Sequence, residues 1–110
     1  MNIFAVPPKK PKMNISGSEL REGELADMSC TTDARPPAKL VVIVGESNLT
    51  VQETIIRDEQ KDMYVTMVTY PGQVSRSWQR KKTKCCIVTN AGSIGACSAA
   101  TTINVLCKLY

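Results

Sequence analysis

Two adjacent cysteines, Cys85 and Cys86, lie in the strand-like stretch TKCCIVT and constrain the fold more than any other feature of this sequence. Neighbouring residues of a β-strand face opposite sides of a sheet, so one of the two side chains should be buried and the other exposed. Three further cysteines stand at positions 30, 97 and 107, and no C-x-x-C pair occurs. This spacing disfavours a zinc site and predicts one or two disulfides formed in an oxidising compartment.

The segments between turn residues have the pattern of β-strands, and no helical apolar period occurs along the chain. Residues 24–30 alternate, with Ala26, Met28 and Cys30 on one face, and residues 39–45 form a β-branched run that ends at a glycine. Further strands are predicted at residues 9–16, 63–70, 84–89 and 97–106. About seven strands at roughly 8–12-residue spacing predict an all-β fold, a two-sheet β-sandwich.

The chain of 110 residues is long enough for one domain with a modest core. Residues 1–8 contain the extended stretch FAVPP and are predicted to be an interdomain linker or an added remnant, whereas residues 9–110 are predicted to form the domain. No signal peptide, membrane-spanning stretch or lipidation motif is visible. We therefore expect an excised part of a longer protein whose transmembrane segment lies outside this chain.

The sequence lacks the residues that several classes of function require. The chain has no histidine, which removes the usual general base and the usual metal ligand. No S-x-x-K motif and no Gly-rich phosphate loop occur, so neither an enzyme nor a cofactor is predicted. The net charge of +4 is mild, and Trp78 is the one aromatic residue interleaved with the basic residues, so nucleic acid is not an expected partner.

Two N-x-[ST] sequons begin at Asn14 and Asn48. They are candidate glycosylation sites, and they fit the oxidising, extracellular compartment that the cysteines indicate. The alternative is that these three-residue motifs occur by chance, because the pattern is short and common.

Several segments together resemble the immunoglobulin superfamily over nearly the whole chain. The stretch SCTTDARPPAKLVV looks like the passage from strand B to strand C in constant- or intermediate-type domains of cell-adhesion receptors. The stretches AVPPKKP and LREGE are similar to inner domains of nephrin-like and nectin-like receptors, and CIVTNAG matches the strand F signature. The resemblance implies an immunoglobulin-like two-sheet Greek-key β-sandwich. It also implies an extracellular inner domain of a plasma-membrane adhesion or guidance receptor.

In this family one buried disulfide joins strands B and F, and the matching positions here are Cys30 and Cys86. Such a bond closes a loop long enough to stabilise the fold by roughly 4 kcal/mol in the chain-entropy model. Two family residues are missing, because the strand C tryptophan is Val42 and the tyrosine two positions before the second cysteine is Lys84. Trp78 can fill part of the volume of the absent tryptophan.

The resemblance leaves Cys85, Cys97 and Cys107 unassigned, as a second disulfide or as free thiols. A hairpin turn after strand F would place Cys97 across from Cys86, but a Cys85–Cys97 bond would join side chains on opposite faces. Cys107 lies too far along the last strand to reach Cys85 and would pair with a neighbouring domain or stay free. A rival assignment exchanges Cys85 and Cys86 and needs a bulge or a slip that turns Val88 outward.

A candidate protein-binding face follows from strand alternation. If Leu40, Val42 and Val44 face the core, the residues between them face outward. On strand F, Cys86 and Val88 are expected to face the core, so the residues on either side of them also face outward. Strands C and F are neighbours in this fold, so the outward residues form a partly apolar patch of the kind that marks contact surfaces. The alternative is that these are scattered surface aliphatics without a function. The predicted face consists of Lys39, Val41, Ile43, Ile87 and Thr89.

A basic cluster precedes and enters strand F. It favours binding of a heparan-type glycan or an acidic partner, with a solvated turn as the alternative. Its members are Arg76, Arg80, Lys81, Lys82 and Lys84. The partners implied by the resemblance are other cell-surface immunoglobulin-like receptors, homophilic or heterophilic, and neighbouring domains of the same chain. Two roles are considered: recognition by protein contact, and a spacer that positions other binding domains.

Overall fold

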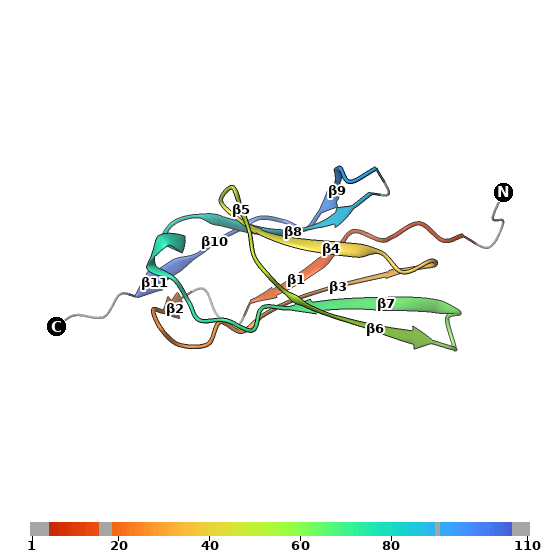
Figure 1. Cartoon of the computed structure of the whole chain (residues 1–110), viewed down its shortest axis with the longest axis horizontal. Coiled ribbons are helices and arrows are strands. Elements are labelled where there is room, and N and C mark those ends of the chain that lie inside the picture. The colour runs from red at the N-terminus through yellow and green to blue at the C-terminus, as the bar shows by residue number, and fades with distance from the viewer. Residues whose placement is uncertain (1–4, 16–18, 90, 107–110) are drawn as a thin grey trace.

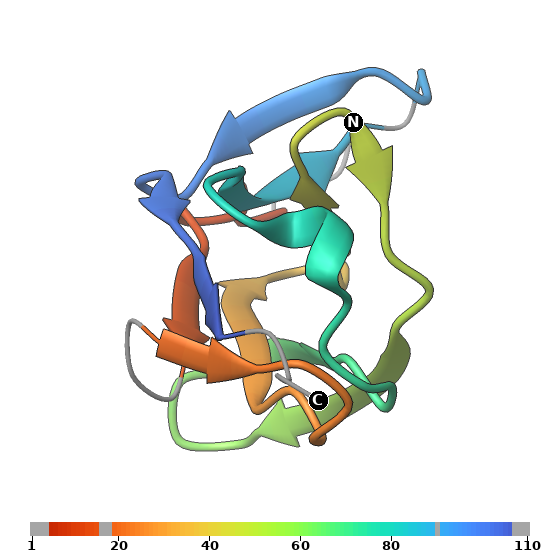
Figure 2. The same cartoon turned by 90° about the vertical axis from the view of Figure 1, so that its left-hand side faces the viewer.

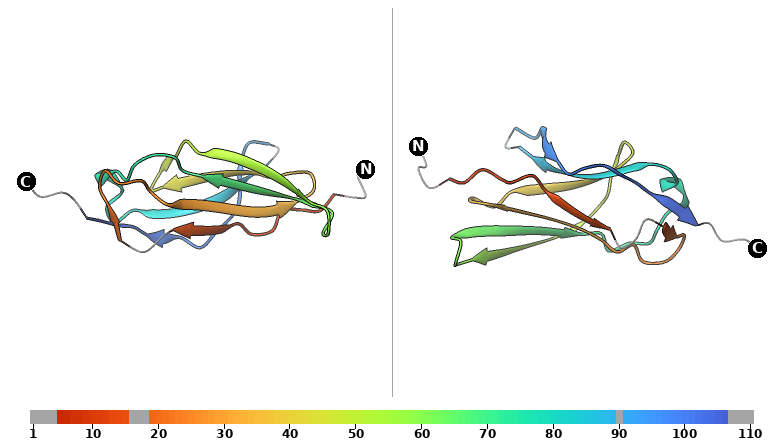
Figure 3. Two further views of the ribbon diagram at one scale, coloured as in Figure 1. Left: turned by 90° about the horizontal axis from the view of Figure 1, so that it is seen from below. Right: turned by 180° about the vertical axis from the view of Figure 1, so that it is seen from behind.

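Two β-sheets pack face to face in the computed structural model, which describes residues 5–15, 19–89 and 91–106 (Figure 1). The first sheet has the antiparallel order β1 (Lys12–Ile15), β3 (Met28–Ala34), β7 (Met63–Thr69), β6 (Gln52–Asp58). Strands β1 and β6 form its two edges (Figure 3).

The second sheet contains the strands that carry the candidate face. Its order is β10 (Thr101–Thr102), β8 (Lys82–Val88), β4 (Lys39–Val44), β5 (Ser47–Asn48), and β9 (Ile94–Cys97) also pairs with β8. A short parallel pair, β2 (Glu19–Arg21) with β11 (Asn104–Leu106), lies at one end of the sandwich.

The two-sheet β-sandwich predicted from the sequence is confirmed, and seven of the described strands have four or more residues. Three strands differ clearly from their predictions. The strand predicted at 24–30 is β3, which begins at Met28 and continues to Ala34. The strand predicted at 9–16 is the shorter β1, and the one predicted at 97–106 begins at Ile94 and divides into β9, β10 and β11. The division follows Ser98, whose N–H donates to the Cys85 carbonyl at 2.8 Å and whose hydroxyl accepts from the Cys85 N–H at 3.0 Å. Because Ser98 meets Cys85 with its side chain as well as its backbone, the ladder is interrupted there.

The turn between β4 and β5 shows why a glycine ends the β-branched run. Val44 pairs with Ser47, so the turn consists of Gly45 and Glu46. Gly45 has a φ of +63°, which residues with a Cβ rarely adopt, and a Cβ there would lie 2.9 Å from Lys81 Cδ. Gly45 therefore allows the tight reversal that sets β5 at the edge of the second sheet.

Figure 2 shows the two layers of the sandwich seen along its long axis. Two clusters of buried side chains fill the space between these layers. One surrounds the inter-sheet disulfide and consists of Cys30, Leu40, Val42, Val68, Cys85 and Ile87. The other surrounds Trp78, at the end of the short helix η1 (Arg76–Trp78), and also contains Leu20, Ala26, Met28, Val44, Val74, Ile103 and Val105.

Trp78 does not take the place of the missing strand C tryptophan. It meets the ring of Tyr70 edge-on, with the ring centroids 5.4 Å apart, inside the second cluster. Val42 belongs to the first cluster, beside the disulfide. The expectation that Trp78 fills the volume at Val42 is therefore wrong, because η1 places the indole near β11 instead.

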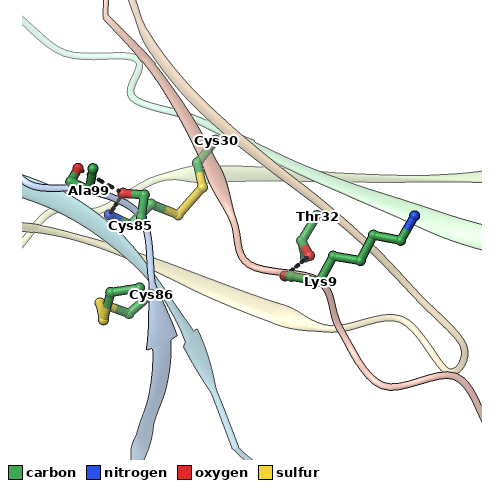
Figure 4. The surroundings of a disulfide bond; sticks show 8 residues. Lys9, Cys30, Thr32, Cys85, Cys86 and Ala99 are labelled. Atoms are coloured by element: carbon green, nitrogen blue, oxygen red, sulfur yellow. Dashed lines mark hydrogen bonds between the residues drawn. A yellow bond between two sulfur atoms is a disulfide. The ribbon is translucent and has the colours of Figure 1, made fainter.

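The inter-sheet disulfide joins Cys30 of β3 to Cys85 of β8, with the two Cα atoms 6.4 Å apart (Figure 4). The predicted pairing of Cys30 with Cys86 is therefore wrong. In the β4–β8 register Val42 stands opposite Cys85, and directly opposed residues share a face of the sheet. Because Val42 points into the core, Cys85 points into the core as well, and Val88 faces outward as the rival assignment requires.

A second disulfide joins Cys86 to Cys97 on the outer side of the second sheet. The two residues stand opposite each other in the β8–β9 ladder, as the sequence predicts, and their Cα atoms are 4.0 Å apart. Cys86 is fully buried although it points away from the core, because the bond and the neighbouring strand cover its side chain. Cys107 lies outside the described residues.

In the family, a tyrosine stands two residues before the core cysteine of strand F. Because that cysteine is Cys85, the corresponding residue here is Thr83 and not Lys84. Thr83 is fully buried, and its Oγ1 has no hydrogen-bond partner in the described part of the chain. Thr66, equally buried on β7, donates its hydroxyl to the Ala38 carbonyl at 2.9 Å. Thr32, also buried, donates its hydroxyl to the Lys9 carbonyl at 2.6 Å, so Thr83 is the buried threonine of the described residues whose hydroxyl has no partner.

Removing the two disulfides separately should lower stability by unequal amounts. The Cys30–Cys85 bond spans 55 residues of sequence and the Cys86–Cys97 bond spans 11. These loops correspond to about 4 and about 3 kcal/mol in the chain-entropy model, and loss of the core bond also leaves a cavity. In urea denaturation, Cys30→Ala/Cys85→Ala should therefore lower the free energy of unfolding more than Cys86→Ala/Cys97→Ala does.

A third double variant tests the pairing itself. Cys30→Ala/Cys86→Ala removes one partner of each bond and should be the least stable of the three. If this variant instead kept one disulfide and was the most stable of the three, Cys30 would be paired with Cys86 and the assigned pairing would be contradicted.

Thr83→Val should raise the free energy of unfolding, and Thr66→Val should lower it. Valine keeps the shape of threonine and removes the hydroxyl, so at Thr83 it abolishes a buried polar group without a partner, which costs about 1–3 kcal/mol. At Thr66 the same change leaves the Ala38 carbonyl without its donor. Thermal unfolding should show shifts of opposite sign, about 4–8 °C for each kcal/mol. Two shifts of the same sign would contradict the prediction.

Candidate protein-binding face

The outer side of the second sheet carries a continuous set of paired side chains from four strands. Strands β4 and β8 supply its centre, and β5 and β9 supply its two edges. Since directly opposed residues of antiparallel strands share a face, the register defines three rows of neighbours. This set is named the β4–β8 outer face, and its rows are Asn48, Ile43 and Lys84; Val41, Cys86 and Cys97; and Lys39, Val88 and Ile94.

The side chains of strand β4 alternate between the core and the outer side as the sequence predicts. Leu40, Val42 and Val44 are at most 7% exposed and lie between the sheets. Val41 and Ile43 point to the outer side and are half-buried among their neighbours. A strand that is apolar on both faces is typical of sheets that are covered on both sides, so the outer side of β4 has the composition of a surface that is to be covered.

Ile87 and Thr89 do not belong to the face, contrary to the prediction. Ile87 is 7% exposed and packs beside the inter-sheet disulfide. Thr89 lies in the turn after β8, where its Oγ1 accepts from the Ser93 N–H at 3.2 Å and its N–H donates to the Ser93 carbonyl at 2.8 Å. Lys84 and Val88 take their places, because β8 presents to solvent the side that the sequence analysis assigned to the core.

The Cys86–Cys97 disulfide lies in the middle row of the face, beside Val41. Two register pairs connect β8 to β9, and the register shifts between Cys86 and Val88. In so short and irregular a ladder, a covalent bond is the strongest constraint on the position of β9. The bond therefore holds Ile94, which is 52% exposed, in line with the apolar residues of β8.

Lysines lie on both sides of the middle row of the face. Lys84 stands beside Ile43, Lys39 stands beside Val88, and Lys82 continues the same side of β8 toward its start. None of the three lysines takes part in an ion pair within the described residues. A positive rim around an apolar centre is complementary to a partner surface with acidic groups around apolar side chains.

The structure divides the predicted basic cluster. Arg76, in η1, donates from Nε and Nη2 to the carboxylate of Glu22, at 2.6 and 3.1 Å. This pairing turns Arg76 toward the segment after β2 and away from the lysines of β8. The other members lie in the turn before β8 and on β8 itself, and they are Arg80, Lys81, Lys82 and Lys84.

Both predicted sequons have an exposed asparagine. Asn14 lies on β1, at an edge of the first sheet, and the third residue of its sequon, Ser16, lies outside the described residues. Asn48 lies on β5 opposite Ile43. A glycan attached to Asn48 would therefore stand at the edge of the β4–β8 outer face.

An apolar hollow of about 730 Å³ opens at the end of the sandwich that is opposite β2 and β11. Val6 exchanges two backbone hydrogen bonds with Arg35, at 2.7 and 3.1 Å, and these hold the segment before β1 against the turn between β3 and β4. This segment, Pro36, Pro37 and the turn after β8 line the hollow. Residues 1–4 of the predicted linker lie outside the described residues.

The described residues contain no group of three or more His, Cys, Asp or Glu side chains placed to hold a metal ion. Within the same part of the chain, no helix is long and apolar enough to cross a membrane. The groups that the β4–β8 outer face offers are aliphatic side chains, lysines and a disulfide, which are suited to contact with another surface.

No family model and no curated protein matches this sequence. The structure is nevertheless similar to the crystal structure of Rst D1–D2, with a TM-score of 0.72 at 19% identity, over 94% of this chain and 51% of that chain. It is also similar to the full ectodomain, Ig1–Ig3, of mouse nectin-like molecule 4, with a TM-score of 0.71 at 18% identity, over 94% of this chain and 35% of that chain. This chain thus spans about half and about a third of the two chains that it matches. With its two sheets, its inter-sheet disulfide and these likenesses, the chain has an immunoglobulin-like fold.

Proposed function

We propose that this chain is an extracellular module of a cell-surface adhesion or guidance receptor and that its β4–β8 outer face binds another protein. The observation that carries the proposal is the position of Ile43, Val41 and Val88 in three successive rows outside the core, with Lys84 and Lys39 beside them in the first and third rows. Aliphatic side chains gathered on the solvent side of a sheet mark contact surfaces. The role is one of contact, without catalysis.

The partner that fits this face best is another immunoglobulin-like receptor, either a second copy or a different one. Its contact surface should be apolar at the centre and acidic on either side, because Lys84 and Lys39 lie in the rows on the two sides of the Val41 row. Such complementary charge steers association and excludes partners with a basic rim.

Two observations support an extracellular location. Both disulfides join residues that the fold sets opposite each other, and such bonds persist in oxidising compartments. One of the two similar structures is an ectodomain. We further propose an inner position in the receptor, because the segment before β1 and strand β11 lie at opposite ends of the sandwich (Figure 1). The hollow beside Val6 would then receive a preceding domain.

Val41→Glu together with Ile43→Glu should weaken binding through the face and leave the fold intact. Both side chains point away from the core, so the unfolding temperature should stay close to that of the unchanged chain. Two carboxylates in the apolar centre would be desolvated on binding, and affinity should fall at least about tenfold. The measurement is surface plasmon resonance against a panel of recombinant immunoglobulin-type ectodomains that includes this chain itself.

The matched control is Leu25→Glu, because Leu25 is 76% exposed and lies outside both sheets. This variant should bind as the unchanged chain does. A partner whose affinity is unaffected by the Val41 and Ile43 substitutions would show that binding uses another surface. If no ectodomain in the panel binds, the spacer role replaces the recognition role.

A further inference from the structure

Strand β6 leaves one side of its backbone without a strand partner in the described part of the chain. It forms an edge of the first sheet and pairs with β7 through all seven of its residues, Gln52–Asp58 (Figure 3). Alternate residues of an antiparallel strand direct their N–H and C=O groups away from a single neighbour. The outer edge of β6 therefore presents a row of donors and acceptors that can pair with another strand.

The side chains of β6 leave this edge accessible to pairing with another strand. Six of its seven residues are exposed, and Ile55 and Ile56 are 45% and 55% exposed. Proteins commonly protect such an edge with charged side chains, proline or a bulge. Strand β6 contains no proline, its register with β7 is continuous, and its charged residues Glu53, Arg57 and Asp58 are of both signs, so they can pair across a two-fold axis.

We propose that β6 pairs antiparallel with β6 of a second copy of this chain, about a two-fold axis at Ile55. The pairing would join two four-stranded sheets edge to edge and form a closed dimer. This surface is separate from the β4–β8 outer face, and the proposal goes beyond the function proposed above.

Charge complementarity supports this register. Ile55 is the middle residue of β6, so an axis there pairs all seven residues of each copy. Glu53 then faces Arg57 of the second copy, and by symmetry Arg57 faces the second Glu53. Opposite charges directly across a ladder stabilise the pair, and Ile55 meets its own counterpart between them.

The neighbouring two-fold registers lose this match. Moving the axis to Thr54 sets Glu53 opposite Ile55, and moving it to Ile56 sets Arg57 opposite Ile55. Both shifts also leave part of the strand unpaired. The register at Ile55 is therefore the one in which length, charge and the central aliphatic contact agree.

Both charged side chains can reach across the edge. Glu53 makes no hydrogen bond or ion pair within the described residues. Arg57 donates from Nη1 to Tyr64 Oη at 3.2 Å and from Nη2 to Asp62 Oδ1 at 2.6 Å, which leaves Nε to donate. The hydrogen bond that Arg57 donates to Tyr64, together with the electrostatic interactions with Tyr64 and Asp62, raises the pKa of Arg57 above its ordinary value, and the guanidinium stays cationic. These contacts hold Arg57 in place and reduce the entropy lost on pairing.

Disulfide trapping tests the register. Ile55→Cys in a Cys107→Ser background places two thiols directly opposite each other, about 4.5–5.5 Å apart between Cα atoms, within the range of a disulfide. Thr54→Cys is the matched control, because its counterpart lies two residues away along the partner strand, beyond the ~7 Å limit. Under mild oxidation, Ile55→Cys should give a covalent dimer whose yield rises with concentration. Cross-linking no faster than that of Thr54→Cys would overturn the proposal.

Charge reversal tests the pairing without a covalent bond. In sedimentation equilibrium, Glu53→Arg and Arg57→Glu should each raise the dimer dissociation constant about tenfold or more, because like charges face each other twice. An equimolar mixture of the two variants restores both opposite-charge pairs and should associate as the unchanged chain does. Glu46→Arg makes the same charge change in the exposed turn before β5 and should have no effect.

In the association measurements, three outcomes would overturn the proposal. They are a chain that stays monomeric up to about 1 mM, a series of species larger than a dimer, and a mixture that associates no better than either variant alone. Circular dichroism of each variant checks that the fold is kept. The Val41→Glu/Ile43→Glu chain should still form the β6 dimer, which separates failure of this inference from failure of the proposed face.

Discussion

The pairing of Val42 with Cys85, locked by the bond from Cys85 to Cys30, decides the facing of every residue of β8. Strand side chains alternate with a period of two, so one residue fixed in the core fixes the rest. With Cys85 inside, Ile87 is in the core and Val88 is on the outer side. A slip of one residue would exchange these sets and place Ile87 instead of Lys84 and Val88 on the candidate face. The surface of the second sheet is therefore a consequence of the core bond.

The outer disulfide has a different physical role. The Cys86–Cys97 bond spans few residues, so it constrains the unfolded chain less than the core bond does. Its effect in the folded chain is local, because it fixes an irregular ladder and keeps Ile94 beside the aliphatic residues of β8. Because strand alternation turns the adjacent cysteines to opposite sides of the sheet, Cys85 stabilises the sandwich and Cys86 fixes the surface of the second sheet.

The same alternation explains which parts of the structure the sequence could predict. Strands β3 and β4 could be oriented because each has a set of residues that only the core suits. Strand β8 could not, because both faces of KCCIVT are apolar and the family signature begins at Cys86. The β4 half of the face was therefore predictable and the β8 half was not. The positions of Trp78 and Ser98 depend on contacts between segments far apart in the sequence, which no local pattern contains.

The two proposed surfaces would act together if both are used. A two-fold axis at Ile55 is normal to the joined sheet, and rotation about such an axis keeps both β4–β8 sheets on the same side. The two outer faces of the dimer would then point in one direction, toward one opposing surface. A face of modest area binds weakly alone, but two linked faces raise the effective concentration for the second contact. The backbone edge of β6 would thereby supply avidity, while the side chains of β4 and β8 would supply specificity.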